Sequence, residues 1–167
     1  MMKSWAIVIA AYLADIAVRI FIQPREWSPD LLLLAILYVT LSAPLGEAYF
    51  ISLVSGLFWD GAFLDFYGMH SFLFILAAMI TARLRPLLWV QYAISRLLLG
   101  FLLSALVRFG ETIFWLSNME HPLPLAWPQR YILAGAVVSG VCFMLFPWRS
   151  KPISLARKSP QTLFANR

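Results

Sequence analysis

Two acids and a histidine at equal spacing are the residues of this chain best suited to chemistry: Asp60, Asp65 and His70. Carboxylates and an imidazole can exchange protons with a substrate or ligate a metal ion. On a helix, however, side chains five residues apart point about 140° away from each other around the helix axis, so the three do not share one face. A loop could still gather them. The sequence contains no HExxH, GxSxG or paired-cysteine motif, so we expect no catalytic residue, no metal and no cofactor.

Asp60 lies near the end of an apolar run that begins at Gly56, and Gly68 follows it. A carboxylate in such a segment is costly in lipid and persists only where it faces protein or water. We therefore interpret Asp60 as the mark of a contact site. The alternative is a helix-end acid that caps a helix or holds a turn by accepting backbone N–H bonds. Gly56 and Gly68 would then serve packing and turn geometry.

Other charges also lie inside apolar segments. Asp15 and Arg19 are four residues apart, acid before base, which predicts an ion pair on one helix face; contact with another subunit is the alternative. A later segment carries a polar stripe whose members fall within about 120° of each other on a helix. We expect this stripe to face the chain's own bundle, with a partner protein as the alternative, and Arg108 to pair with Glu111. The stripe consists of Arg96, Gly100, Ser104, Arg108 and Glu111.

The composition is that of an integral membrane protein. Of the 167 residues, 62% are hydrophobic and 13% are charged, whereas soluble domains have roughly 45–50% and 25%. Too few polar side chains remain to cover a surface in water. Cys142, the single cysteine, has no disulfide partner in the chain and is expected to pack as a small apolar residue. The basic C-terminal tail would meet anionic membrane lipid, and no nucleic-acid binding is expected.

Six apolar segments predict an all-α, polytopic bundle of six transmembrane helices. The second segment is about 15 residues and roughly 22 Å long, which is short of the roughly 30 Å hydrocarbon core. It must cross a thinned membrane or lie buried among its neighbours. Ser28 is predicted as its N-cap, with Pro29 at the first helical position. The predicted segments are 5–22, 29–43, 47–64, 69–84, 94–116 and 129–146, with an interfacial stretch at 87–92 and a stiff proline-containing loop at 117–128.

Small residues recur at four-residue spacing in the last segment. Gly135 precedes Ser139 in this way, and Ala136 precedes Gly140. Small side chains let helices approach closely, so this face is expected to pack inside the bundle, with a dimer face as the alternative.

Six crossings place both termini on one side of the membrane. Basic residues favour the cytoplasmic side of a membrane. More of them lie on the side of the termini than on the other side, which carries Arg25 and Arg130. Both termini are therefore predicted to be cytoplasmic, with residues 1–147 forming the transmembrane domain and 148–167 a basic cytoplasmic tail. Asp60 and His70 would then lie on the outer side. The basic residues on the side of the termini are Lys3, Arg83, Arg85, Arg149, Lys151, Arg157, Lys158 and Arg167.

Residues 29–68 combine proline, tyrosine, glycine and acid at a joint spacing. The pattern is Pro29-x8-Tyr38-x5-Pro44-x11-Gly56-x3-Asp60-x7-Gly68. Together with the chain length and the six predicted crossings, it resembles the MreD family of bacterial rod shape-determining proteins. The resemblance covers about 40 of the 167 residues, and the rest of the chain matches only in character. Where many family members have a further glycine or two, this chain has Phe50 and Ser52, which leaves the closeness of helix packing there open.

The resemblance implies a role without catalysis. MreD proteins reside in the bacterial inner membrane and work with MreC, a bitopic protein with a periplasmic domain. Together they join the actin-like MreB filament inside the cell to the glycosyltransferase RodA and its partner transpeptidase outside, and so help to position peptidoglycan synthesis. The MreD fold is also similar to the substrate-binding subunits of energy-coupling-factor vitamin transporters, which have a pocket open to the outer face. A vitamin-binding transporter subunit is therefore the alternative function.

Short helices broken at Pro44, Gly61 and Gly68 are expected to leave a cleft on the outer side, lined by Asp60. Its aromatic neighbours suit contact with a protein better than with a polar vitamin. The cleft is therefore predicted to receive a transmembrane or juxtamembrane helix of MreC. The predicted partner-binding residues are Gly56, Trp59, Asp60, Asp65, Gly68 and His70, while Pro29, Tyr38 and Pro44 are predicted to be structural positions of the family pattern.

Overall fold

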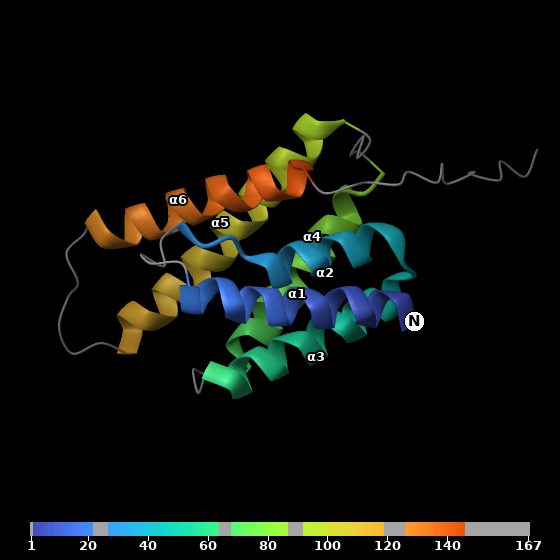
Figure 1. Cartoon of the computed structure of the whole chain (residues 1–167), viewed down its shortest axis with the longest axis horizontal. Coiled ribbons are helices and arrows are strands. Elements are labelled where there is room, and N and C mark those ends of the chain that lie inside the picture. Colours follow the sequence, from blue (N-terminus) through green and yellow to red (C-terminus); the bar gives the residue numbers. More distant parts are fainter. Residues whose placement is uncertain (1, 22–26, 64–67, 87–91, 119–125, 146–167) are drawn as a thin grey trace, which may run out of the picture.

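The computed structural model describes residues 2–21, 27–63, 68–86, 92–118 and 126–145, and these residues form a bundle of six helices (Figure 1). The odd-numbered helices run in one direction along the bundle and the even-numbered helices run in the other (Figure 1). The predicted all-α, six-helix fold is confirmed, but the predicted break at Gly61 is wrong, because α3 continues through Gly61 to Phe63. The helices are α1 (Met2–Phe21), α2 (Leu31–Ser42), α3 (Leu45–Phe63), α4 (Met69–Leu84), α5 (Ala93–Asn118) and α6 (Ala126–Leu145).

The last two helices are longer than the sequence predicted. α5 runs on to Asn118 and α6 starts at Ala126, so both extend into the predicted proline-containing loop. Pro128 lies in the first turn of α6, where the missing N–H of proline has no helical acceptor in any case. The rest of that loop, most of the interfacial stretch, residues 23–26 between the first two predicted segments and the tail 148–167 lie outside the described residues.

The start of α2 differs from the prediction. The N-cap residue is Asp30, with φ −86° and ψ 71°, rather than Ser28, and its side chain makes no capping hydrogen bond. Arg108 donates hydrogen bonds to both the Ser28 carbonyl and the Asp30 carboxylate. Asp30 has the non-helical backbone of an N-cap residue while its carbonyl accepts the Leu34 N–H at 3.0 Å, so the helix begins at Leu31. At the other end, Ala43 is extended, with φ −103° and ψ 170°, as the residue before a proline must be.

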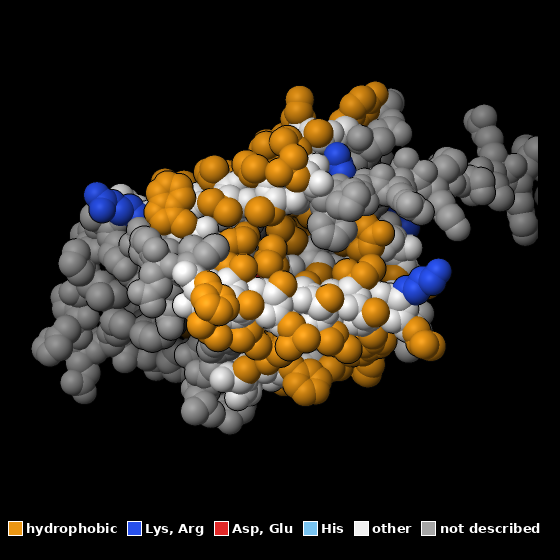
Figure 2. All heavy atoms as spheres, viewed as in Figure 1, with side chains coloured by type: hydrophobic (Ala, Val, Ile, Leu, Met, Phe, Trp, Pro, Cys, Tyr) orange, Lys and Arg blue, Asp and Glu red, His pale blue; other side chains and the backbone are white. Residues whose placement is uncertain are grey.

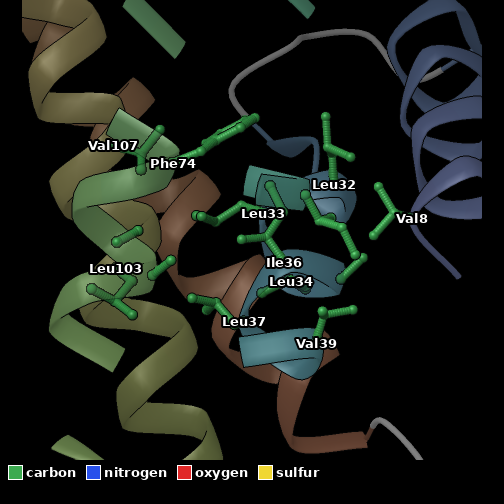
Figure 3. Close-up of a cluster of buried hydrophobic side chains, with 14 of the residues drawn as sticks. Val8, Leu32, Leu33, Leu34, Ile36, Leu37, Val39, Phe74, Leu103 and Val107 are labelled. Atoms are coloured by element: carbon green, nitrogen blue, oxygen red, sulfur yellow. The ribbon is translucent and has the colours of Figure 1, made fainter. Parts of the chain in front are cut away.

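α2 is the central helix of the bundle. Nine of its 12 residues are buried, and it contacts each of the other five helices. Figure 3 shows its leucines and isoleucine reaching toward Val8 of α1, Phe74 of α4 and Leu103 of α5. At about 18 Å it is too short to cross a membrane alone. The structure shows the second of the two alternatives given for this short segment, burial among its neighbours.

The distribution of polar and apolar side chains is inverted relative to a soluble protein. Figure 2 shows a face covered by hydrophobic side chains, and single large residues such as Phe58 are 65% exposed. Inside, Asp60 and Arg108 are 0% exposed. Among the described residues, Met2–Phe21 and Ala93–Phe114 are long and apolar enough to cross a membrane, and three shorter helices are apolar. An apolar exterior around buried charges suits lipid as the surrounding solvent.

Close helix contacts occur where a residue has no side chain. A Cβ atom on Gly56 of α3 would lie 2.3 Å from the Cα atom of Ser71 on α4. A Cβ atom on Gly140 of α6 would lie 3.0 Å from the carbonyl oxygen of Leu97 on α5. The small residues of the last helix therefore pack inside the bundle, as predicted.

Gly56→Ala is expected to destabilise the protein because the new methyl group meets backbone atoms and forces α3 and α4 apart. Overpacking of this kind costs about 1–3 kcal/mol, so the midpoint of thermal unfolding in detergent should fall by several degrees. Gly61→Ala on the same helix is the matched control, because no atom lies within 4 Å of its Cβ position. Equal melting temperatures for the two variants would contradict the close packing at Gly56.

Candidate functional site

A network of charged and polar side chains is buried at one end of the bundle. The residues fall late in the odd-numbered helices and early in the even-numbered ones, so the alternating helix directions bring them to the same level. Five of the described helices contribute a residue to the network, and Asp30 immediately precedes the remaining helix, α2. The members with ionisable side chains are Asp15 and Arg19 on α1, Asp30 at the start of α2, Asp60 on α3, His70 on α4, Arg108 and Glu111 on α5, and Tyr131 on α6.

Arg108 joins α5 to the starts of α2 and α6. Its Nη2 and Nε atoms lie 2.8 and 2.9 Å from the two carboxylate oxygens of Asp30, which is the bidentate geometry that suits a guanidinium and a carboxylate. Nη2 also donates to the Ser28 carbonyl, and Nη1 donates to the Tyr131 carbonyl at 3.1 Å. The predicted pairing of Arg108 with Glu111 is wrong, because each of these side chains finds a partner on another helix.

Small and hydroxylated residues make room for the Arg108–Asp30 pair. Ser104 donates its hydroxyl hydrogen to an Asp30 carboxylate oxygen, and the Asp30 backbone N–H donates to the Ser139 hydroxyl at 3.0 Å. A Cβ atom on Gly135 would lie 1.9 Å from Cζ of Arg108, so only glycine leaves space for the guanidinium. The polar stripe of α5 therefore faces the chain's own bundle at Gly100, Ser104, Arg108 and Glu111, as predicted.

Asp60 and His70 form a second part of the network, which joins α3, α4, α5 and α6. One Asp60 carboxylate oxygen accepts the Gly68 N–H at 2.8 Å, and the other accepts the His70 N–H at 3.2 Å. The His70 ring lies between two acids, with Nδ1 2.6 Å from Asp60 and Nε2 3.0 Å from Glu111. The other Glu111 oxygen accepts the Tyr131 hydroxyl at 2.7 Å. Gly68 takes a left-handed conformation, φ 90°, at the N-cap of α4, which glycine adopts without steric cost.

The ion pair predicted within α1 is present. Nε of Arg19 lies 3.6 Å from Oδ2 of Asp15, and Asp15 also accepts the Leu31 N–H at 3.1 Å. The Arg19 guanidinium lies over the Trp59 ring, 4.6 Å from its centroid, a cation–π contact. These interactions attach α1, whose only buried residues are Val8 and Asp15, to α2 and α3.

A small cavity lies between these parts of the network. Its volume is about 10 Å³, and its walls include Asp15, Asp30, His70 and Glu111. That is room for about one water molecule. Pockets for vitamin-sized ligands are about 300–1,000 Å³, so this cavity does not support the alternative of a vitamin-binding subunit.

The residues predicted to line an open cleft are mostly inside the bundle. Trp59, Asp60 and His70 are buried, and Gly56 lies against the backbone of α4; Asp65 lies outside the described residues. The expectation that Asp60 faces an open cleft differs from the structure, because backbone N–H groups and an imidazole occupy its carboxylate. Its contacts are those of the alternative interpretation, an acid that caps a helix, because it accepts the Gly68 and His70 N–H groups at the start of α4.

The remaining predicted positions are spread over the fold. Pro29 is buried beside Asp30, Tyr38 is partly buried, and Pro44 is exposed just before α3. Arg96 is partly buried near the start of α5, far along the chain from the network residues of that helix. Asp30, Ser139 and Tyr131 are members of the site that the sequence did not predict.

An apolar exterior, a charged interior and six helices define a polytopic membrane protein. A family profile described as "rod shape-determining protein MreD" matches residues 1–148. The chain therefore belongs to the MreD family, as its resemblance implied, and is a non-enzymatic membrane protein of rod-shape determination and of the cell elongation machinery. No curated protein and no solved structure matches the chain.

Arg108→Met is expected to leave the Asp30 carboxylate buried without its cation, which costs about 3–5 kcal/mol when a buried pair is broken. Asp30→Asn should also destabilise the protein, and the double variant should recover much of the summed loss. Unfolding of the purified protein in detergent, measured for both single variants and the double variant, gives the coupling energy. Simply additive losses would show that the two side chains do not stabilise each other.

Proposed function

We propose that this protein is a membrane scaffold of the cell elongation machinery that binds MreC and helps to position peptidoglycan synthesis. One observation carries the proposal: in the described part of the chain, the buried acids and bases at one end of the bundle pair with each other, while large apolar side chains lie exposed on the helix surfaces. A bundle of this kind offers the membrane rigid helix surfaces rather than a ligand pocket. Such surfaces suit the transmembrane helix of another protein.

The proposed MreC-binding region is the α3–α4 corner, which we define as Gly56, Trp59, Asp60, Asp65, Gly68 and His70 with the exposed residues beside them. The buried side chains Asp60 and His70 would act indirectly, by fixing the angle between the helices. The side chains in direct contact with MreC would be the exposed apolar neighbours. Leu57, Phe58 and Phe72 are 51%, 65% and 62% exposed and could make this contact. Large aromatic side chains of this kind are enriched at protein contacts.

The wider assembly follows from the same proposal. MreC would link the bundle to RodA and its partner transpeptidase on the outer side, and MreB would be reached on the inner side. Membrane lipid would cover the remaining apolar helix faces. The bundle's own part is to hold these proteins in a fixed arrangement, without a reaction of its own.

A photo-crosslinking amino acid placed at Phe58 or Phe72 is expected to form crosslinks to MreC in native membranes. The same substitution at Leu133 or Val137, which are 57% and 50% exposed on α6, is the matched control and should give few. Crosslinks from α6 but not from the α3–α4 corner would place the contact elsewhere.

Co-purification tests the buried part of the corner. Asp60→Ala and Gly68→Leu should reduce the amount of MreC retained, because both disturb the start of α4. Each variant must first elute as a folded protein in gel filtration. Full retention of MreC by two folded variants would remove the corner from the proposal.

Both termini are proposed to be cytoplasmic. In the described residues, Lys3, Arg83 and Arg85 lie at the ends of helices where α1 begins and α4 finishes, whereas Arg130 lies at the opposite end. In a Cys142→Ser background, cells with an accessible periplasm and an intact inner membrane are treated with an impermeant thiol reagent. The reagent should label Arg130→Cys and leave Lys3→Cys unlabelled. The reverse pattern would invert the topology.

A further inference from the structure

The His70 ring has a carboxylate oxygen at each of its nitrogen atoms. Nδ1 lies 2.6 Å from an Asp60 oxygen, and Nε2 lies 3.0 Å from a Glu111 oxygen. Both acids also act as acceptors at their other contacts. Asp60 accepts two backbone N–H groups, and Glu111 accepts the Tyr131 hydroxyl.

A neutral imidazole cannot satisfy this arrangement while both acids are ionised. It carries one N–H group, so its second nitrogen would present a lone pair to a carboxylate oxygen. In the buried interior, where His70 is 3% exposed, no bulk water relieves such a repulsion. An imidazolium has two N–H groups and donates to both acids. The geometry therefore requires a hydrogen at each ring nitrogen, and with Asp60 and Glu111 both ionised the ring itself holds the second one.

The surrounding charges favour the same protonation state. Asp15 is paired with Arg19 on α1, and Asp30 at the start of α2 is paired with Arg108 on α5. Asp60 from α3 and Glu111 from α5 share His70 from α4, with the neutral Tyr131 of α6 donating to Glu111. The Arg19 charge also acts on Glu111 from the wall of the same cavity. A cation between two buried anions lowers the cost of both.

We propose that Asp60, His70 and Glu111 form a proton-binding site in which a resident imidazolium ties α3, α4 and α5 together. Loss of the proton leaves a ring lone pair against a carboxylate oxygen and weakens the contact of α4 with one of its neighbours. An ordinary histidine in an unfolded chain loses this proton near about pH 6.5. The folded state then holds a proton that the unfolded state has released, so stability falls as the pH rises above that value.

Nitrogen NMR on histidine-labelled protein in nanodiscs tests the protonation state directly. The chain has two histidines, and His121→Ala leaves His70 as the only signal. Both ring nitrogens should give imidazolium signals at neutral pH and should keep them well above about pH 6.5. A spectrum with one unprotonated ring nitrogen at neutral pH would overturn the proposal.

Thermal unfolding at a series of pH values tests the structural consequence. The melting temperature of the parent and of the His121→Ala control should fall by several degrees between about pH 6 and pH 9. Glu111→Gln offers an amide that can donate to an unprotonated ring nitrogen, so its melting temperature should depend less on pH. An equal pH dependence in the parent and in Glu111→Gln would show that the proton is not held between these residues.

Discussion

A charge that has left water must find its partner inside the protein, and this constraint organises the whole bundle. The Arg108–Asp30 pair shows it most plainly, since both side chains are buried and their contacts join α2, α5 and α6. In lipid, apolar helix packing alone gains little from the exclusion of water, because the lipid tails are as apolar as leucine. Polar links and close dispersion contacts therefore decide how the helices sit against each other.

The polar links explain features that would otherwise look unfavourable. α2 is too short to cross a membrane alone, yet its first turn is anchored through Asp30, and its remaining length is covered by neighbours. Gly135 and Ser139 give α6 little side-chain volume at the level of the guanidinium, and the space is filled by Arg108 itself. The weak burial of α1 is offset by the Asp15–Arg19 pair and by Trp59 beneath it.

The sequence predicted the number of helices, the buried stripe of α5 and the ion pair of α1, because each depends on neighbours along one helix. It did not predict the pairing of Asp30 with Arg108, which lie 78 residues apart. Helical spacing points only to partners three or four residues away, and so it assigned Glu111 to Arg108 instead. A signal was present: Asp30 begins one apolar segment and Arg108 lies late in an oppositely directed one, so both fall at the same depth.

The same limit explains the interpretation of Asp60. The sequence indicates that a carboxylate in an apolar segment is energetically costly. It does not indicate which groups hydrogen-bond to the carboxylate, because those groups belong to the start of the next helix, α4. Gly68 and His70 at the start of α4 contact the carboxylate, so the acid is used within the fold rather than displayed. The only sequence signal for Tyr131 as a site residue is its expected depth in the membrane, because a tyrosine near a helix start has many roles in membrane proteins.

The separation of Asp30 from Arg108 also has a consequence during biosynthesis. Ribosomes add about 5–20 residues per second, so an interval of 78 residues means that the acid emerges roughly 4–16 s before the arginine. Through that interval the nascent chain contains α1 and α2, joined later by α3 and α4, and a carboxylate whose permanent cation does not yet exist. The bundle thus becomes self-sufficient in lipid only after its fifth segment has been inserted, and a polypeptide released earlier retains an uncompensated acid at membrane depth.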